Sequence, residues 1–260
     1  MLIKVPFTNT KGAYREGITK GTVKAPDEIL KAIEDVWSNE SYKNVELEQR
    51  QIKEISSCEK IFDEAKEFLE KDEKVVFLGG DHSISYDLVR AFKEFYKRSG
   101  LLVFDAHLDC MPPHKFPNHE EWLRALIEKK IFSTREIVHV GLRAACLEEI
   151  NFAKEKKLLF FSCKELFENF KKNVQKIVEK VRRFENLYIS IDIDAIDPAF
   201  APGVAYIEPG GLTSREFLYL IQKLSVLKNL KAIDLVCVNP EKDFKNMTAK
   251  LAAKIVAELL

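Results

Sequence analysis

Apolar residues along this chain form short continuous runs that alternate with amphipathic stretches. The runs lack the alternation of a half-exposed strand, which is typical of strands covered on both faces. The predicted strands are residues 74–78, 101–104, 136–140, 158–161, 187–191 and 232–238. Elsewhere apolar positions recur at helical spacing. The predicted helices are residues 26–37, 58–69, 84–96, 120–127, 174–184, 215–227 and 243–260.

Strands that alternate with helices in this way predict a doubly wound α/β sheet whose strands are mostly parallel. No internal repeat, low-complexity segment or linker-like stretch interrupts the pattern. A chain of 260 residues is long enough to bury one large core. We therefore expect a single domain over residues 1–260.

Polar motifs directly follow several predicted strands. The motifs are Gly79-Gly80-Asp81-His82-Ser83, Asp105-Ala106-His107-Leu108-Asp109, Asp192-Ile193-Asp194 and Asn239-Pro240. Alternate residues of an extended segment point to the same side, so Asp105, His107 and Asp109 are expected to converge. The same holds for Asp192 and Asp194. Ligands of open α/β sheets bind outside the carboxyl ends of strands, so we expect these motifs to share one edge.

Such a cluster predicts a metal site, because crowded carboxylates repel one another unless cations neutralise them. Exposed loop charges or helix caps would explain any single Asp, but not two spaced runs beside a Gly-Gly-Asp-His turn. The expected ligands are His82, Asp105, His107, Asp109, Asp192 and Asp194. Two imidazoles and four carboxylates exceed the needs of one ion, so we expect two. Oxygen-rich ligation with some imidazole favours manganese over zinc.

Two ions about 3.5 Å apart can bridge a water molecule and lower its pKa. The expected chemistry is therefore hydrolysis at an electrophilic carbon or phosphorus.

Composition argues against several other classes of function. The 41 basic and 41 acidic residues give a formal net charge of zero, which indicates neither a nucleic-acid partner nor a membrane surface. Five scattered cysteines without CxxC spacing argue against a disulfide framework or a structural zinc site. The N-terminus lacks a signal-peptide pattern, and no uncharged apolar run reaches transmembrane length. We expect a cytoplasmic protein that acts on a small molecule.

Three sequence runs carry a family resemblance. They are Gly-Gly-Asp-His-Ser, Asp-Ala-His-x-Asp and Ser-Ile-Asp-Ile-Asp-Ala-Ile-Asp-Pro-Ala-Phe-Ala-Pro-Gly, in order over residues 79–203. In order and approximate spacing they resemble the signatures of the ureohydrolases, the arginase–agmatinase–formimidoylglutamase family. Softer similarity extends to residues 20–26 and 234–240. The resemblance implies a three-layer α/β/α sandwich, in agreement with the strand and helix pattern.

The same resemblance implies how two manganese ions would be held. One ion would bind His82, Asp105, Asp109 and Asp192, and the other Asp105, His107, Asp192 and Asp194. Asp105 and Asp192 would bridge the two ions. Family members hydrolyse guanidinium or related C–N bonds, often releasing urea, through a metal-bridging hydroxide. They are commonly homo-oligomers, so a trimer or hexamer is expected here.

A catalytic histidine is also implied by the resemblance. His119 lies downstream of the second motif, where the family has a proton-shuttling histidine, so we expect His119 to be catalytic together with Asp105. His114 is a weaker rival in the same loop. A polar residue at a helix start is the alternative reading of His119.

Four further residues have less specific roles. His139 sits inside a predicted strand and is expected to be a structural histidine whose ring nitrogens are satisfied by hydrogen bonds. Asp81 precedes a predicted metal ligand and could orient it. Asp197 and the proline after it are expected to shape the turn that follows the last ligands. Arg143 could face the rim or be a surface charge.

One position departs from the family pattern. Typical members have a glutamate at the position of Cys237, and this glutamate pairs with the guanidinium-like part of the substrate. A thiol cannot form that bidentate pair. Losing such a partner in a dry site would remove roughly 2–5 kcal/mol of recognition. Residues 204–211 also differ from the Gly-Thr-Gly-Thr-Pro stretch of agmatinases.

Three explanations of Cys237 stay open. Another acid such as Glu208 could supply recognition, the substrate could be an amide or formimino compound, or catalysis could be lost. The leading hypothesis is a manganese-dependent hydrolase of a linear C–N bond. One alternative is a deacylase-like amide hydrolase with a single zinc ion on His107, Asp105 and Asp192. Another is a non-catalytic metal-binding or assembly protein.

Overall fold

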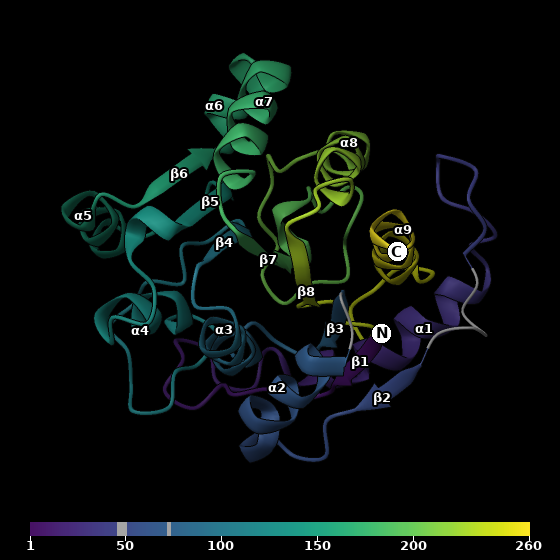
Figure 1. The fold of residues 1–260 in the computed structure, drawn as a ribbon, viewed down its shortest axis with the longest axis horizontal. Coiled ribbons are helices and arrows are strands. Elements are labelled where there is room, and N and C mark those ends of the chain that lie inside the picture. The colour runs from purple at the N-terminus through teal and green to yellow at the C-terminus, as the bar shows by residue number, and fades with distance from the viewer. Residues whose placement is uncertain (46–50, 72–73) are drawn as a thin grey trace.

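The computed structural model describes residues 1–45, 51–71 and 74–260. The strands of this part of the chain form one eight-stranded sheet with the order β2-β1-β3-β8-β7-β4-β5-β6 (Figure 1). They are β1 (Leu2–Val5), β2 (Ile52–Glu54), β3 (Val75–Gly79), β4 (Ser99–Phe104), β5 (Ile137–Leu142), β6 (Leu159–Ser162), β7 (Asn186–Asp192) and β8 (Leu230–Val236). Every neighbouring pair runs parallel, so the predicted parallel sheet is confirmed.

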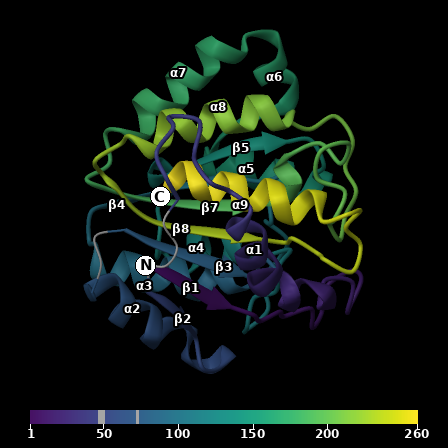
Figure 2. The same ribbon diagram turned by 90° about the vertical axis from the view of Figure 1, so that its right-hand side faces the viewer.

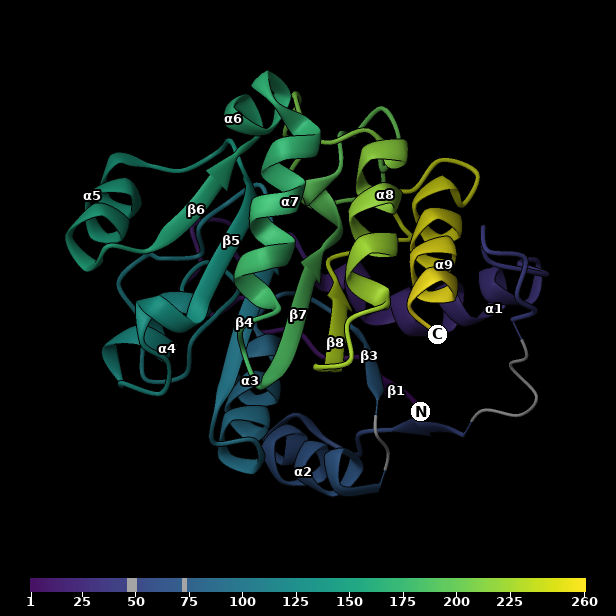
Figure 3. The same cartoon turned by 45° about the horizontal axis from the view of Figure 1, so that its top comes forward.

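Helices cover both faces of the sheet. They are α1 (Ala25–Glu34), α2 (Ile61–Lys71), α3 (Ile84–Phe95), α4 (Trp122–Glu128), α5 (Leu147–Lys156), α6 (Cys163–Glu168), α7 (Phe170–Val181), α8 (Ser214–Ser225) and α9 (Met247–Leu259). On one face α2, α3 and α4 pack in succession, and on the other α1, α9, α8 and α7 do (Figures 1 and 3). Figure 2 shows the second group in the order α7, α8, α9 and α1 from top to bottom. The expected three-layer α/β/α sandwich is confirmed.

The central strands explain why the sequence pattern was continuous rather than alternating. Every residue of β3, β4 and β5 is buried, because helices cover both of their faces. The strands β1 and β2, which lie at the β2 edge of the sheet, were not predicted. The strand β1 has only four residues, and β2 is a three-residue edge strand that is exposed throughout. Such short runs carry too little apolar pattern to be recognised.

Two helices were also missing from the prediction, α5 and α6. In α5 only Glu149, Phe152 and Ala153 are buried, so its apolar stripe is narrow. The last helix, in turn, begins later than predicted. The carboxylate of Asp243 accepts hydrogen bonds from the backbone N–H groups of Thr248 and Ala249, which places Asp243 before the first turn of α9. None of the helices in the described ranges combines the length and apolar character needed to cross a membrane.

The order of the strands positions the polar motifs. The strands β3, β8, β7 and β4 are consecutive neighbours in the sheet, although they are far apart in the chain. Their carboxyl ends therefore lie next to one another. A Cβ atom at Gly80 would lie 2.0 Å from the carbonyl oxygen of Phe7. Only glycine lets the segment after β1 pass this close to the end of β3.

Candidate metal centre

The six predicted ligand side chains lie together at the carboxyl ends of β3, β4 and β7. The prediction that they converge because alternate residues of an extended segment point to the same side was wrong. The strand β4 ends at Phe104, so the second motif lies outside it. Asp109 has a φ of 50°, in the left-handed region. The turn η4 (Ile193–Ala195) is a 3-10 turn, and Asp192 begins it by accepting a hydrogen bond from the Asp194 N–H at 2.9 Å. Tight turns, rather than alternation along a strand, bring these side chains together.

A first group of ligand atoms surrounds the imidazole of His82. Its Nδ1 lies 3.0 Å from Oδ2 of Asp105, 2.9 Å from Oδ2 of Asp109 and 3.4 Å from Oδ2 of Asp192. All four side chains are buried. Atoms this close, from residues of these types, can share one cation.

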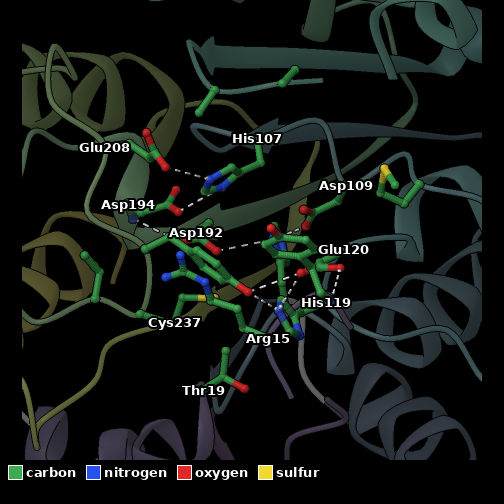
Figure 4. A pocket seen from close by; sticks show the side chains of 18 of the residues that line it. Arg15, Thr19, His107, Asp109, His119, Glu120, Asp192, Asp194, Glu208 and Cys237 are labelled. Atoms are coloured by element: carbon green, nitrogen blue, oxygen red, sulfur yellow. Dashed lines mark hydrogen bonds and ion pairs between the residues drawn. The ribbon is translucent and has the colours of Figure 1, made fainter. Parts of the chain in front are cut away.

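A second group surrounds the imidazole of His107, as Figure 4 shows. Its Nδ1 lies 3.3 Å from Oδ1 of Asp105 and 3.1 Å from Oδ2 of Asp194. Asp105 thus offers one carboxylate oxygen to each group. Two adjacent sites with a shared carboxylate fit a pair of ions better than one.

Unpartnered atoms test whether a cation fits. Nδ1 of His82 and Oδ2 of Asp105 are buried and have no hydrogen-bond partner within the described residues. Buried polar atoms are nearly always satisfied, so two such atoms facing each other require an explanation. A cation between them would satisfy both, and imidazole with carboxylate oxygen suits manganese. The residues therefore fit the implied metal.

The electrostatics of the cluster lead to the same conclusion. Burial, reinforced by Asp194 and Asp105, raises the pKa of Asp192 well above its usual range. Burial and the charge of Asp105 likewise raise the pKa of Asp109 to about 8. The carboxyl groups of Asp109 and Asp192 therefore favour the neutral form unless positive charge is supplied. A divalent cation supplies that charge and removes the reason for protonation.

A buried hydrogen-bonded series orients His82. Its Nε2 lies 3.0 Å from the hydroxyl oxygen of Ser190. That hydroxyl donates to Oδ1 of Asp234 at 2.7 Å, and the hydroxyl of Tyr188 donates to Oδ2 of Asp234 at 2.8 Å. Since Ser190 uses its proton on Asp234, Nε2 of His82 carries the proton that Ser190 accepts. This tautomer leaves the Nδ1 lone pair free for a metal.

Of the two candidate histidines, only His119 lines the cavity above the cluster. Its Nε2 lies 3.3 Å from the hydroxyl of Tyr206, which donates to Oε1 of Glu120 at 3.1 Å. Its Nδ1 is buried, has no hydrogen-bond partner in the described chain and lies 3.7 Å from Oδ2 of Asp81. His114 instead pairs with Glu121, 3.0 Å away, and is not among the lining residues.

The contacts of two less specific residues are now clear. The carboxylate of Asp81 accepts hydrogen bonds from the Thr19 hydroxyl at 2.8 Å and from the N–H of Ser83 at 3.1 Å, and its Oδ2 lies 3.7 Å from Nδ1 of His119. It thus holds the turn that carries His82 and also faces His119. Arg143 is not a surface charge. Its guanidinium donates to the carbonyl oxygen of Asp194 at 2.6 Å and to that of Glu208 at 2.7 Å. It thereby ties the last ligand turn to the loop that follows.

One further prediction agrees with the structure, and another holds only in part. The carboxylate of Asp197 accepts hydrogen bonds from the N–H groups of Gly210 at 2.7 Å and Gly211 at 3.0 Å, and so shapes the turn after the ligands. His139 is fully buried in β5, as expected, but neither of its ring nitrogens has a hydrogen-bond partner among the described residues, so it is not satisfied. Burial lowers its pKa to about 4, so it is a neutral core histidine.

A cavity of about 690 Å³ lies over the cluster (Figure 4), within the range of small-molecule sites. Both predicted substrate-binding residues line it. Cys237 follows β8 with a φ of 67°, and its N–H donates to the carbonyl oxygen of Gly80 at 2.8 Å. The carboxylate of Glu208 is one-third exposed, and its Oε1 lies 3.6 Å from Nε2 of His107.

Several lining or supporting residues were not predicted. Arg15 and Tyr206 lie on loops, where no periodicity marks them, and Glu120 lies in the turn before α4, although it was expected inside that helix. The sequence marks Asp234 only weakly, as a single acid inside an apolar strand. It does not mark Trp122 as part of the site, although the Nε1–H of Trp122 donates to Oδ2 of Asp109 at 2.8 Å.

Known proteins resemble this chain over most of its length. An agmatinase of Bacillus subtilis (strain 168) is 31% identical over 195 residues, covering 74% of this chain and 64% of the relative. Arginase 1, mitochondrial, of Arabidopsis thaliana is 37% identical over 195 residues, covering 70% of this chain and 53% of the relative. The alignment thus spans less than two thirds of either relative.

Comparison with solved structures gives the same fold. Formimidoylglutamase from Bacillus subtilis subsp. subtilis str. 168 superposes with a TM-score of 0.87 at 23% identity, covering 99% of this chain and 84% of that one. The family model described as "Arginase family" matches residues 1–260. The chain therefore belongs to the arginase family.

Proposed function

We propose that this protein is a hydrolase of a linear C–N bond, of amidine or guanidino type, that uses two manganese ions per subunit. The observation that carries the proposal is the pair of ligand groups sharing Asp105 at the base of the cavity. The unpartnered, buried Nδ1 of His82 and Oδ2 of Asp105 support it. Membership of a family that contains arginases and agmatinases makes a C–N bond the expected target.

Each ion would have its own imidazole. His82 and Asp109 would hold one, His107 and Asp194 would hold the other, and Asp105 would serve both. Asp192, with Oδ2 at 3.4 Å from Nδ1 of His82, would complete the shared set. When bound, the ions would act as Lewis acids and make water a stronger nucleophile near neutral pH.

His119 would move protons between the cavity and solvent. It is almost fully buried, yet it lines the cavity. The Tyr206 hydroxyl on Nε2 and the Asp81 carboxylate near Nδ1 restrict the orientation of the ring.

Glu208 would bind the cationic part of the substrate in place of the missing glutamate. Cys237 lies at the cavity wall, where its thiol hydrogen-bonds with Asp192, and burial raises the pKa of that thiol well above its usual range. A neutral thiol gives an amidinium no charge-assisted partner. The carboxylate of Glu208 lines the same cavity, and its Oε1 lies 3.6 Å from Nε2 of His107.

The remaining properties are predictions drawn from the family resemblance and the sequence pattern. A cavity of about 690 Å³ suits a small-molecule substrate. A single-domain subunit, a homotrimer or homohexamer and a cytoplasmic location stay predictions.

The test combines metal analysis with a substrate panel. Purified protein is loaded with manganese, its metal content is measured, and release of urea or ammonia is followed with agmatine, arginine, 4-guanidinobutanoate and formiminoglutamate. We expect two ions per chain and turnover of at least one compound. No uptake of manganese, or two bound ions without turnover of any compound, would contradict the proposal. If Cys237→Glu then restores guanidine hydrolysis, the metal half of the proposal survives and the substrate half is wrong.

A further inference from the structure

A single cationic side chain of the lysine or arginine type lines the cavity within the described residues, and it is Arg15. The other charged or ionisable lining residues are acids, histidines, tyrosines and cysteines. Arg15 is exposed, and no carboxylate of the described chain lies within ion-pairing distance of it. Arginine usually finds an anionic partner when a site is built around it.

The nearby acids are already engaged. Oε2 of Glu120 accepts a hydrogen bond from the N–H of Tyr14 at 2.9 Å, and Oε1 accepts from the Tyr206 hydroxyl at 3.1 Å. Both oxygens of Glu149 accept from backbone N–H groups, those of Cys110 at 3.0 Å and Cys146 at 3.1 Å. Both acids therefore have hydrogen-bond partners of their own, and in the described chain neither forms an ion pair with Arg15.

The loop that carries Arg15 is held in place. The N–H of Gly12 donates to the Glu16 carboxylate at 2.8 Å, and the N–H of Gly17 donates to the Thr10 hydroxyl at 3.0 Å. Thr19 closes the loop onto Asp81 through its hydroxyl. The backbone on both sides of Arg15 is therefore fixed, so its side chain is directed to the cavity by a structured loop (Figure 4).

The charge of Arg15 acts on the cavity wall. Burial raises the pKa of Tyr206, the carboxylate of Glu120 raises it further, and the positive charge of Arg15 acts in the opposite direction. Tyr206 also stacks edge-on against His107, with ring centroids 5.6 Å apart. The guanidinium thus acts on a lining side chain that contacts His107 of the candidate metal centre.

We propose that Arg15 binds a carboxylate at the end of the substrate remote from the metal centre. The substrate class is then an amidino or guanidino carboxylic acid, not an amidino or guanidino amine. This inference rests on the proposed function and adds the chemistry of the substrate's other end. A guanidinium binds a carboxylate through two parallel hydrogen bonds, whereas it repels an ammonium group.

A matched pair of substrates tests the preference. 4-Guanidinobutanoate and agmatine both carry a guanidino group on a four-carbon chain, and they differ in a terminal carboxylate against a terminal ammonium. The manganese-loaded protein is expected to have the higher kcat/KM on the carboxylate. Arg15→Ala should raise KM for 4-guanidinobutanoate by about tenfold, which corresponds to ~1.4 kcal/mol. Its kcat and its manganese content should change little.

Three further variants sharpen the assignment. Arg15→Lys should restore part of the lost affinity, because an ammonium keeps the charge but not the bidentate geometry. Arg15→Glu should reverse the preference toward agmatine. Arg182→Ala, an exposed arginine at the end of α7, is the matched control and should leave both KM values unchanged.

Binding measurements separate this inference from the proposed function. Calorimetric titration of the manganese-loaded protein with 4-aminobutanoate and with butane-1,4-diamine probes the remote end without turnover. Selective, Arg15-dependent binding of the carboxylate supports the inference even if the protein hydrolyses no compound of the panel, an outcome that would refute the proposed function alone. Equal binding of the two probes, or a preference unchanged in Arg15→Ala, would overturn the inference.

Discussion

The two halves of the candidate active site are built differently. The metal half consists of side chains that follow three strands, β3, β4 and β7, and nearly all of it is buried. The substrate half consists of loops around residues 9–19 and 204–211, where Arg15 and Glu208 are at least partly exposed. The sheet thus fixes the groups that need accurate placement, while the loops present groups that can change without disturbing it.

Arg143 ties the loop of residues 204–211 to the metal half. The guanidinium of Arg143 donates to a carbonyl oxygen of the last ligand turn and to that of Glu208. Both acceptors are backbone carbonyl groups, so these hydrogen bonds do not depend on the side chains of the loop. The substrate loop can therefore vary in sequence and still be held against the metal half.

The largest effect should come from the carboxylate that both metal groups share. Asp105→Asn removes charge from both sites, so we expect loss of manganese binding and a fall in kcat/KM of roughly a thousandfold or more. Metal content by elemental analysis and turnover together measure this. Asp63→Asn, an exposed carboxylate on α2, is the control. Normal manganese binding by Asp105→Asn would contradict the assignment of Asp105 to the metal half of the site.

The second-largest expected effect is a pH dependence of the free energy of unfolding, caused by the buried His139. His139 has a folded-state pKa of about 4, against about 6.5 in an unfolded chain. The unfolded state therefore binds more protons between these values, and stability falls as the pH drops from about 6.5 to about 4. The loss approaches about 3 kcal/mol. Urea unfolding of the metal-free protein and of His139→Gln across this range measures it; equal pH slopes would contradict the prediction.

A smaller effect is expected from the support of a ligand. Ser190→Ala removes the hydroxyl that holds Nε2 of His82, and manganese affinity should fall by roughly 10- to 100-fold. Ser99→Ala is a matched control, because Ser99 is also a buried strand serine and its hydroxyl has no partner among the described residues. Titration with manganese should separate the two variants, and equal affinities would refute the orienting role.

The smallest effect should be confined to the substrate half. Tyr206→Phe keeps the ring but loses the hydroxyl between His119 and Glu120, so kcat should fall by up to about tenfold. The pH profile of kcat should move as well, whereas manganese affinity should not. Tyr219→Phe, half-buried on α8, provides the control. A loss of manganese from Tyr206→Phe would show that the two halves are not independent.

Much of the architecture was predictable because buried strands are apolar on both faces. The strands from β3 to β8 were found in this way, whereas β1 and β2 were too short or too exposed to leave a pattern. The candidate ligands were found because they directly follow buried strands. Their geometry was not, since Asp109 adopts a left-handed conformation and Asp194 lies in a 3-10 turn.

The sequence by itself determined the kinds of side chain at the metal centre and the family to which they point. The order of neighbouring strands, by contrast, was decided only in the tertiary structure, and with it the distances between His82, Asp105 and Asp192 at the edge they were expected to share. The pairing of Arg143 with two loops and the place of Arg15 in the cavity were decided there too. The physical reason is that strand periodicity and strand ends are local properties, whereas contacts between loops depend on how distant segments pack.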